Sequence, residues 1–191
     1  MQQKTLSLLT KCRLIVRCGV GYDNVDIQAA KELNIPVANI PDYGTEEVAD
    51  AAIGLSLDLL RKISFLNRHL QRSRDDWHYQ VALPIRRLRG LKCGVVGCGR
   101  IGTAFAVRAK ALGLEVQFYD PDLPDGYDKA IGVDRCDTLE ELLESSDLIS
   151  LHCPLTETTR EMINSETIAL KKSGSQHVNT ARGSIVDPRA V

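Results

Sequence analysis

Residues 91–102 read LKCGVVGCGRIG, an apolar run that passes directly into a G-x-G-x-x-G loop. The first half, Leu91–Val96, has the length and composition of a buried strand. The second half opens an amphipathic helix predicted over Arg100–Leu112, which Gly113 ends. A strand, this glycine loop and a helix in immediate succession are typical of the first turn of a dinucleotide-binding fold.

Each position of the loop has a physical reason for its residue type. Gly97 permits the tight turn after the strand, Gly99 lets the backbone approach a pyrophosphate, and Gly102 lets helix and strand pack closely. Arg100 and Ile101 stand in the first turn of the helix, whose free N–H groups and positive dipole end favour an anion. A glycine loop alone is a weak signal, and a plain glycine turn is the alternative.

An acidic residue stands where this fold places the partner of the cofactor's ribose. Asp120 follows a strand predicted over Glu115–Tyr119. A carboxylate there accepts hydrogen bonds from the adenosine ribose 2′-OH and repels a 2′-phosphate. The next residue is Pro121 rather than a basic one. The sequence therefore predicts NAD(H) as the cofactor in preference to NADP(H).

Strands and helices continue to alternate after Asp120. Two helices are predicted over Thr138–Ser145 and Ser165–Lys171, and two strands over Leu148–His152 and Gln176–Asn179. This alternation predicts an α/β fold, a doubly wound parallel sheet of the Rossmann type.

The part of the chain before residue 85 has a different pattern of predicted elements. Its predicted elements are a strand at Cys12–Cys18, a helix at Asn24–Leu33, a strand at Pro36–Asn39, a helix at 45–70 and a linker at Gln71–Pro84. The long helix is predicted because its apolar residues recur at three- and four-residue steps. The linker is polar and irregular.

Composition restricts the classes of function. The 191 residues carry 24 Lys+Arg against 25 Asp+Glu, a formal charge of −1, whereas nucleic-acid binding usually shows as a basic excess. No apolar run approaches the ~18 residues that a membrane span needs, and residues 1–11 lack the build of a secretory signal. We therefore expect a cytoplasmic or nuclear protein with no direct nucleic-acid or membrane partner.

Six cysteines leave a disulfide or zinc interpretation to be considered. They are Cys12, Cys18, Cys93, Cys98, Cys136 and Cys153. No two of them form a C-x-x-C pair, and four lie in or beside apolar runs, where cysteine behaves as a small buried hydrophobe. We predict reduced thiols and no metal site.

Six blocks spread over the chain resemble one family. They are RCGVGYDNVD (17–26), NIPDYGTEEVAD (39–50), RLRGLKCGVVGCGRIG (87–102), FYDPDLPDG (118–126), SDLISLHCPLTETT (146–159) and VNTARGSIVD (178–187). Together they resemble the D-isomer-specific 2-hydroxyacid dehydrogenases, and FYDPDLPDG and SDLISLHC are most similar to the C-terminal-binding protein branch. The resemblance implies an NAD-binding Rossmann domain over 85–191, a hinge helix and linker over 42–84, and a remnant of a flavodoxin-like substrate domain over 1–41.

The resemblance also implies roles for individual residues. Arg182 matches the active-site arginine that holds the carboxylate and keto oxygen of a 2-keto acid, although a surface-loop arginine is the plain alternative. Val20 and Gly21 match the loop whose N–H groups receive that carboxylate. Further cofactor contacts are implied at Gly44, Thr45, Cys153, Pro154, Thr159, Thr180 and Ala181. The helix at 45–70 is implied to form a two-fold dimer, or else is simply a core helix.

The resemblance places the acid/base histidine of the family downstream of the segment 178–187, and the chain ends at Val191. His152 does not match that histidine and is predicted to be structural. We therefore expect a fragment, C-terminally truncated within its NAD-binding domain, that binds NAD without turnover.

Two functions of different classes stay open. One is an NAD-dependent oxidoreductase that acts on a small 2-keto or 2-hydroxy acid. The other is an NAD(H)-sensing co-repressor scaffold, which binds a transcription-factor peptide in the full-length protein. A fragment that does not fold stably is the third possibility.

Overall fold

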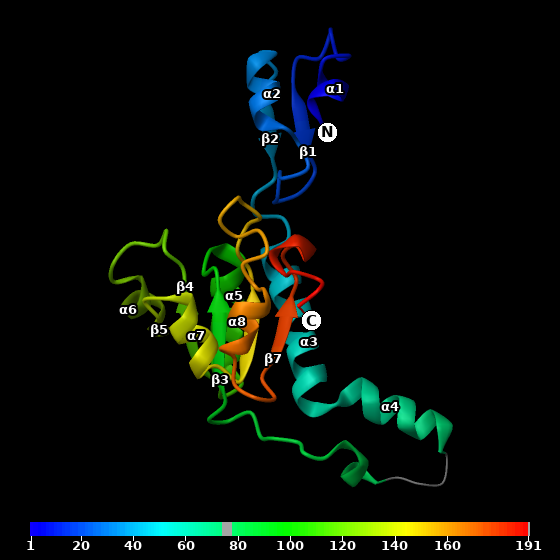
Figure 1. Cartoon of the computed structure of the whole chain (residues 1–191), viewed down its shortest axis with the longest axis vertical. Coiled ribbons are helices and arrows are strands. Elements are labelled where there is room, and N and C mark those ends of the chain that lie inside the picture. The colour runs from blue at the N-terminus through cyan, green and yellow to red at the C-terminus, as the bar shows by residue number, and fades with distance from the viewer. Residues whose placement is uncertain (74–77, 191) are drawn as a thin grey trace. The chain divides into compact units, whose positions relative to one another are not determined.

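The computed structural model describes residues 1–73 and 78–190, drawn in Figure 1. Residues 74–77, part of the predicted linker, and residue 191 lie outside the described residues. Contacts between Cα atoms divide the chain into a first unit, Met1–Thr45, and a second unit, Glu46–Val191.

The first unit is a small parallel α/β arrangement. Its elements are α1 (Gln3–Leu6), β1 (Ile15–Arg17), α2 (Ile27–Glu32) and β2 (Val37–Asn39). The two strands pair in parallel, with Ile15 opposite Val37. Leu6, Ala29 and Ala30 form the buried centre, and the carboxylate of Asp26 caps α2 by accepting the N–H of Ala29 at 2.9 Å.

The second unit is built on a five-stranded parallel sheet. Its strands are β3 (Lys92–Val96), β4 (Glu115–Tyr119), β5 (Asp134–Arg135), β6 (Leu148–Leu151) and β7 (Gln176–Asn179). Their order is β5-β4-β3-β6-β7, so the chain runs from β3 outward to one edge and then returns to build the other side. This order is that of a doubly wound Rossmann sheet, and it confirms the predicted fold class.

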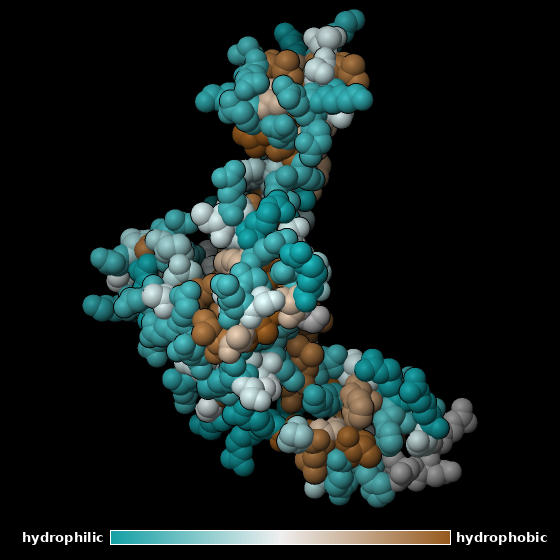
Figure 2. All heavy atoms as spheres, in the orientation of Figure 1, coloured by the Kyte–Doolittle hydropathy of each residue, from teal (hydrophilic) through white to brown (hydrophobic). Residues whose placement is uncertain are grey.

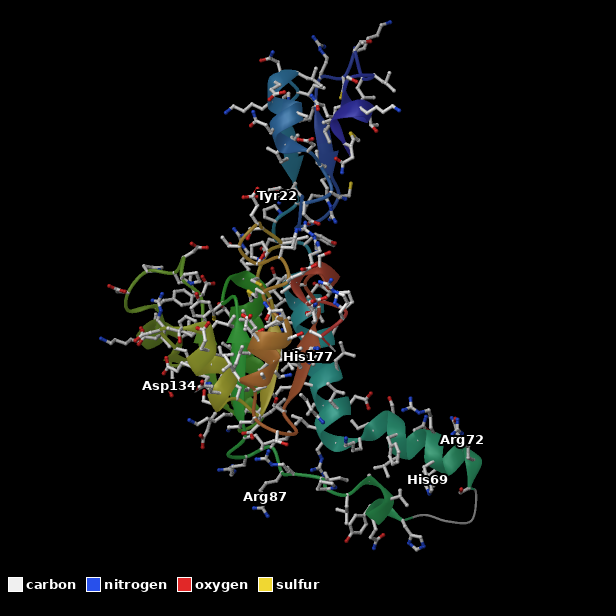
Figure 3. All side chains as sticks on the ribbon, viewed as in Figure 1. Tyr22, His69, Arg72, Arg87, Asp134 and His177 are labelled. Atoms are coloured by element: carbon white, nitrogen blue, oxygen red, sulfur yellow. The ribbon has the colours of Figure 1, made fainter. Side chains whose placement is uncertain are left out.

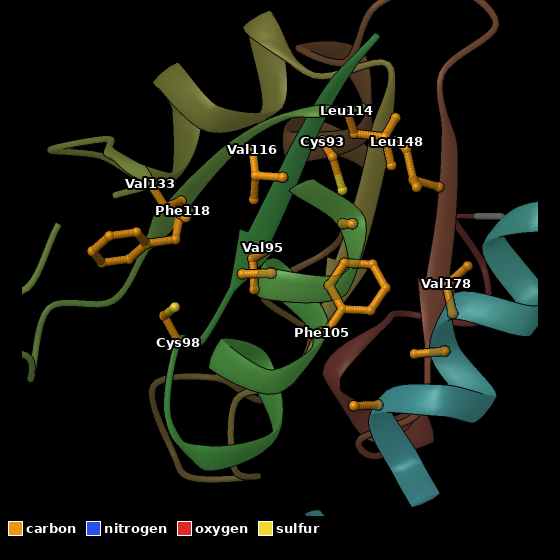
Figure 4. Packing of buried hydrophobic residues seen from close by; sticks show 14 of the residues in the cluster. Cys93, Val95, Cys98, Phe105, Leu114, Val116, Phe118, Val133, Leu148 and Val178 are labelled. Atoms are coloured by element: carbon orange, nitrogen blue, oxygen red, sulfur yellow. The ribbon is translucent and has the colours of Figure 1, made fainter. Parts of the chain in front are cut away.

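Helices cover both faces of this sheet. The helices of the second unit are α3 (Thr45–Arg61), α4 (Ile63–Arg72), α5 (Arg100–Ala111), α6 (Tyr127–Ile131), α7 (Leu139–Ser145) and α8 (Ser165–Ala169). On one face, α3 and α5 bury Ala52, Phe105 and Ala109 against the sheet (Figure 4). On the other face, Leu142 and Leu143 of α7 are buried in a second cluster, against which Ile168 of α8 packs.

The prediction of one helix over 45–70 was wrong, because the structure has two. Lys62 has a φ of 58°, a left-handed conformation that separates α3 from α4. The carboxylate of Asp58 accepts the N–H of Ser64 at 2.6 Å, a bond that satisfies an amide at the start of α4. The apolar spacing runs through the break, so periodicity alone could not reveal it.

Several short elements were not predicted. They are α1, α6, β5 and the 3₁₀ turns at Tyr79–Ala82 and Gly183–Ile185. The other predicted strands and helices agree with the structure to within a few residues. No helix in the described part of the chain is both long and apolar enough to cross a membrane.

Candidate functional site

The predicted cofactor residues of the second unit gather at the carboxyl edge of the sheet. All five strands are parallel, so the loops after β3, β4, β6 and β7 leave from the same edge. The chain reverses its direction of winding between β3 and β6. In open parallel sheets ligands bind in the crevice outside that point.

The glycine loop lies at this switch point. Gly97 has a φ of 84°, and a Cβ there would meet the backbone N of Cys153 at 2.6 Å. A Cβ at Gly102 would collide with the carbonyl of Gly97. A Cβ at Gly99 would meet nothing within 4 Å, which leaves space above the loop for an incoming group.

The start of α5 presents its backbone to that space. Gly99 is the N-cap, and no side chain among the described residues caps this end of the helix. Gly99 and Arg100 are exposed, and Ile101 is half-buried. The first-turn N–H groups and the dipole of a 12-residue helix suit a phosphate. The residues here therefore fit the pyrophosphate of a dinucleotide.

Asp120 connects the end of β4 to the glycine loop. Its Oδ2 accepts the N–H of Cys98 at 2.8 Å, and its Oδ1 accepts the N–H of Asp122 at 3.0 Å. The side chain is half-buried. The carboxylate predicted to meet the adenosine ribose is thus fixed beside the loop predicted to meet the pyrophosphate.

The loop after β6 is held by its own threonines. Thr159 donates from Oγ1 to the carbonyl of Pro154 at 2.6 Å and accepts the N–H of Thr156 at 2.8 Å. Cys153 is buried against Gly97. These bonds hold the loop after β6 in a compact turn beside Gly97.

The segment after β7 contains the predicted catalytic arginine. The Asn179 side chain accepts the N–H of Ala181 at 3.0 Å and donates to the carbonyl of Arg182 at 2.8 Å. Oγ1 of Thr180 is buried and has no hydrogen-bond partner among the described residues. A buried hydroxyl without a partner fits a ligand that is absent, such as a ribose.

The other predicted residues belong to the first unit. Val20 and Gly21 follow β1, and the Asn39 side chain donates to the Val20 carbonyl at 2.7 Å. Gly44 is buried, and Oγ1 of Thr45 donates to Asp42 Oδ1 at 2.9 Å. The roles assigned to these residues stay predictions.

His152 directly follows β6, on the face of the sheet that α5 covers. Its ring centroid lies 4.9 Å from that of Phe105, and its Nε2 lies 2.8 Å from the hydroxyl of Ser150. Burial lowers the pKa of His152 from 6.5 to about 4. The ring is therefore neutral at pH 7, in agreement with the structural role predicted for it.

This burial predicts a pH dependence of stability. The unfolded chain takes up a proton on His152 below pH 6.5, whereas the folded chain resists protonation down to a pKa of about 4. Folding free energy is therefore lost as the pH falls through this window, by about 2 kcal/mol at pH 5 and about 3 kcal/mol at pH 4. Urea unfolding at a series of pH values should show a shallower decline for the His152→Gln variant than for the unaltered chain.

The six cysteines are free thiols, as predicted. Burial raises the pKa of Cys98 and of Cys153 to about 11. Both thiols beside the crevice are therefore protonated and unreactive at neutral pH. No cluster of metal-ligating side chains occurs within residues 1–73 and 78–190.

Sequence reasoning missed three residues that brace the crevice. Arg135 donates to the carbonyl of Asp120, and Thr103 donates to the Cys98 carbonyl of the glycine loop. The Tyr127 hydroxyl bonds to Thr103. Arg135 lies on a two-residue strand, and Tyr127 opens a five-residue helix. Elements this short carry no readable periodicity, so only the motif FYDPDLPDG itself marked the region.

A parallel sheet in this order, with a glycine loop at its switch point, defines a dinucleotide-binding domain. The sequence profile of the family described as "D-isomer specific 2-hydroxyacid dehydrogenase, NAD binding domain" matches residues 53–191. The chain therefore belongs to the D-isomer-specific 2-hydroxyacid dehydrogenases. This match confirms the predicted family and NAD as its cofactor.

Individual relatives agree. C-terminal-binding protein 1 of Caenorhabditis elegans is 37% identical over 191 residues, which is 98% of this chain and 26% of that protein. D-3-phosphoglycerate dehydrogenase of Methanocaldococcus jannaschii is 40% identical over 181 residues, 95% of this chain and 34% of that protein. The chain thus spans between a quarter and about a third of these relatives.

Among solved structures, D-lactate dehydrogenase from Aquifex aeolicus, complexed with NAD and lactic acid, matches with a TM-score of 0.91 and 35% identity. The match covers 100% of this chain and 56% of that one.

Proposed function

We propose that the protein carrying this chain is an NAD(H)-dependent oxidoreductase that transfers a hydride between NADH and a 2-keto acid. The observation that carries the proposal is the joining of Asp120 to the glycine loop, at 2.8 Å between its Oδ2 and the N of Cys98. Arg182 follows β7 at the same edge of the sheet. Both parts that the reaction needs, a cofactor crevice and a cationic substrate anchor, therefore leave from one sheet edge.

The cofactor residues divide by the part of NAD that each would hold. Gly97, Gly99, Arg100, Ile101 and Gly102 would hold the pyrophosphate through the start of α5. Asp120 would accept hydrogen bonds from the adenosine ribose. The remaining contacts are assigned to Gly44, Thr45, Cys153, Pro154, Thr159, Thr180 and Ala181. Bound NADH supplies the hydride.

Arg182 and the loop at Val20 and Gly21 would bind the substrate. A guanidinium presents a planar fork to two oxygens and keeps its charge at every physiological pH. Arg182 would therefore orient the carboxylate of the keto acid and polarise its keto oxygen. The backbone N–H groups at Val20 and Gly21 would receive the same carboxylate.

The likeness to C-terminal-binding protein 1 favours a second function. In this alternative the protein is an NAD(H)-sensing co-repressor scaffold that binds a transcription-factor peptide and acts in the nucleus, rather than an enzyme of the cytoplasm. Turnover of a panel of 2-keto acids by the complete gene product separates the two. Turnover well above that of an Arg182→Ala variant supports the enzyme, and its absence supports the scaffold.

Asp120 is expected to determine the choice between NADH and NADPH. In the Asp120→Ala variant NADH loses a hydrogen-bond acceptor, and NADPH loses a repulsive charge. The dissociation constant for NADPH divided by that for NADH should fall by about tenfold. Both constants are measured by the fluorescence of the reduced nicotinamide. The Asp122→Ala variant, which alters an exposed neighbour, should leave the ratio unchanged. Tighter binding of NADPH than of NADH by the unaltered chain would contradict the assignment.

A two-fold dimer through α3 and α4 is also proposed. Ile63 is 54% exposed and Phe65 43% exposed, and Leu83 just beyond the 3₁₀ turn is 56% exposed. Figure 2 shows apolar residues gathered at this end of the second unit. Such a patch is typical of an interface.

The dimer predicts that Phe65→Asp sediments as a monomer at micromolar concentration, because it places a charge within the apolar surface. The matched control is Leu170→Asp. Leu170 is a 36% exposed leucine at the end of α8, on the other face of the sheet. A monomeric unaltered chain, with or without NADH, would count against the dimer.

A further inference from the structure

We propose that Arg135 is a positioning residue that fixes the adenosine side of the cofactor crevice and thereby enforces the preference for NADH over NADPH. The inference rests on the proposed role of Asp120 and extends it to a side chain that does not itself face the cofactor. Arg135 lies on β5, the edge strand beside β4 (Figure 3 labels the adjacent Asp134).

The guanidinium of Arg135 binds three backbone carbonyls of one turn. Its Nη2 donates to the carbonyls of Asp120 and Leu123, both at 2.9 Å, and its Nη1 donates to that of Pro124 at 3.2 Å. The side chain is only 22% exposed. Its positive charge therefore faces backbone carbonyls at close range, while its ion pair with the fully exposed Asp125 is longer, at 4.0 Å.

Arg135 supports a turn whose own sequence limits the number of hydrogen bonds it can form internally. Pro121 and Pro124 have no N–H to donate. Its local bonds are the N–H of Asp122 to the Asp120 carboxylate at 3.0 Å, which depends on the position of Asp120 itself, and the N–H of Tyr127 to the Pro124 carbonyl at 3.3 Å. A planar fork can reach three carbonyls at once, whereas a lysine ammonium on a single stem cannot reproduce that geometry.

A second set of contacts connects Arg135 to the glycine loop. The Arg135 Cζ lies 5.8 Å from the centre of the Phe118 ring, and that ring packs edge-on against Tyr127 with centroids 6.1 Å apart. The Tyr127 hydroxyl lies 2.8 Å from Oγ1 of Thr103, which donates to the Cys98 carbonyl at 2.8 Å. Cys98 is also the residue whose N–H reaches Asp120.

Asp120 is thus held from both sides, at its backbone carbonyl by Arg135 and at its carboxylate by Cys98. A carboxylate fixed in this way can accept from a ribose hydroxyl and cannot move away from a 2′-phosphate. If the turn is released, NADH loses its acceptor while NADPH gains room. The discrimination between the two cofactors should therefore fall, and not only the affinity.

The test measures NADH and NADPH dissociation constants for the full 191-residue chain by nicotinamide fluorescence. Arg135→Met keeps the length of the stem and removes every donor, and Arg135→Lys keeps the charge and loses the fork. Arg87→Met is the matched control. The exposed Arg87 precedes β3, at the amino-terminal ends of the strands and away from the glycine loop (Figure 3). We expect Arg135→Met to weaken NADH about tenfold and NADPH less than about twofold, with Arg135→Lys intermediate and Arg87→Met unchanged.

Equal losses for both cofactors would mean that Arg135 only supports the fold and would overturn the proposal. Unchanged NADH affinity in both variants would overturn it as well. If Arg135→Met shows no cooperative unfolding transition, it is not folded. The ratio of the NADPH and NADH dissociation constants in Arg135→Lys then decides alone. If the unaltered chain binds neither cofactor, the proposed function fails and this inference fails with it. If the unaltered chain binds NADH and the Arg135 variants bind both cofactors as it does, the inference fails while the proposed function stands.

Discussion

Replacing Gly102 with alanine is expected to weaken NADH binding on the order of 100-fold and to destabilise the second unit. A Cβ at this position would overlap the carbonyl oxygen of Gly97 and lie 3.0 Å from its carbon and 3.4 Å from Cγ1 of Val95. Two of these atoms are backbone of the glycine loop itself. They can move aside only if the loop shifts away from the start of α5.

The expected cost has two parts. Overpacking a close contact typically lowers the free energy of unfolding by about 1–3 kcal/mol. The displaced loop also loses its alignment with the first-turn N–H groups, so NADH affinity should fall on the order of 100-fold, since every 1.4 kcal/mol is about tenfold. Fluorescence titration and urea unfolding measure the two effects separately.

Gly54→Ala is the matched control for this substitution. Gly54 lies exposed within α3, and a Cβ there would meet nothing within 4 Å. This variant should gain about 0.5–1 kcal/mol, because alanine is the better helix former. It should bind NADH normally. A Gly102→Ala chain that binds NADH as tightly as the unaltered one would refute the close helix–loop packing assigned to Gly102.

The glycine loop illustrates how far the sequence alone could lead. The residue types at Gly97 and Gly102 are demanded by backbone contacts between β3, α5 and the loop after β6, so their spacing encodes the fold directly. The long strands and helices were predictable for a similar reason, because their periods extend over many residues. The parallel, doubly wound class of the sheet then follows from the alternation of those elements.

The parts that escaped prediction depend on specific side-chain contacts that leave no repeating pattern in the sequence. The break at Lys62 has no glycine or proline, and its stabilising bond runs from Ser64 to Asp58. Arg135 reaches back over eleven to fifteen residues to Pro124, Leu123 and Asp120. Neither arrangement leaves a local pattern, so neither could be read before the structure placed the partners together.

The 191-residue polypeptide is expected to bind NADH and to show no measurable reduction of 2-keto acids. Reduction of a keto group needs a proton donor near the oxygen that takes up charge. Arg182 cannot serve, because a guanidinium does not give up its proton in proteins. The donor must therefore come from another side chain.

None of the four histidines is suited to that task. With a pKa of about 4, His152 is protonated in only about one molecule in a thousand at pH 7. Burial and the neighbouring Lys171 lower the pKa of His177, whose Nδ1 lies 3.4 Å from the Lys171 ammonium. His69 belongs to α4, and His78 precedes the 3₁₀ turn at Tyr79–Ala82. Neither of these two lies on a loop at the carboxyl edge of the sheet.

Lack of general acid catalysis typically removes about 10²–10⁴-fold in rate. The assay follows NADH oxidation with pyruvate, glyoxylate and bulkier keto acids, with Arg182→Ala as the background. Fluorescence titration in the same buffer establishes that NADH is bound, so an absence of turnover cannot be confused with an empty crevice. Turnover by the unaltered polypeptide clearly above that of Arg182→Ala would mean that a residue of this chain donates the proton. His152 would then be the first to replace, because it directly follows β6 at the carboxyl edge of the sheet.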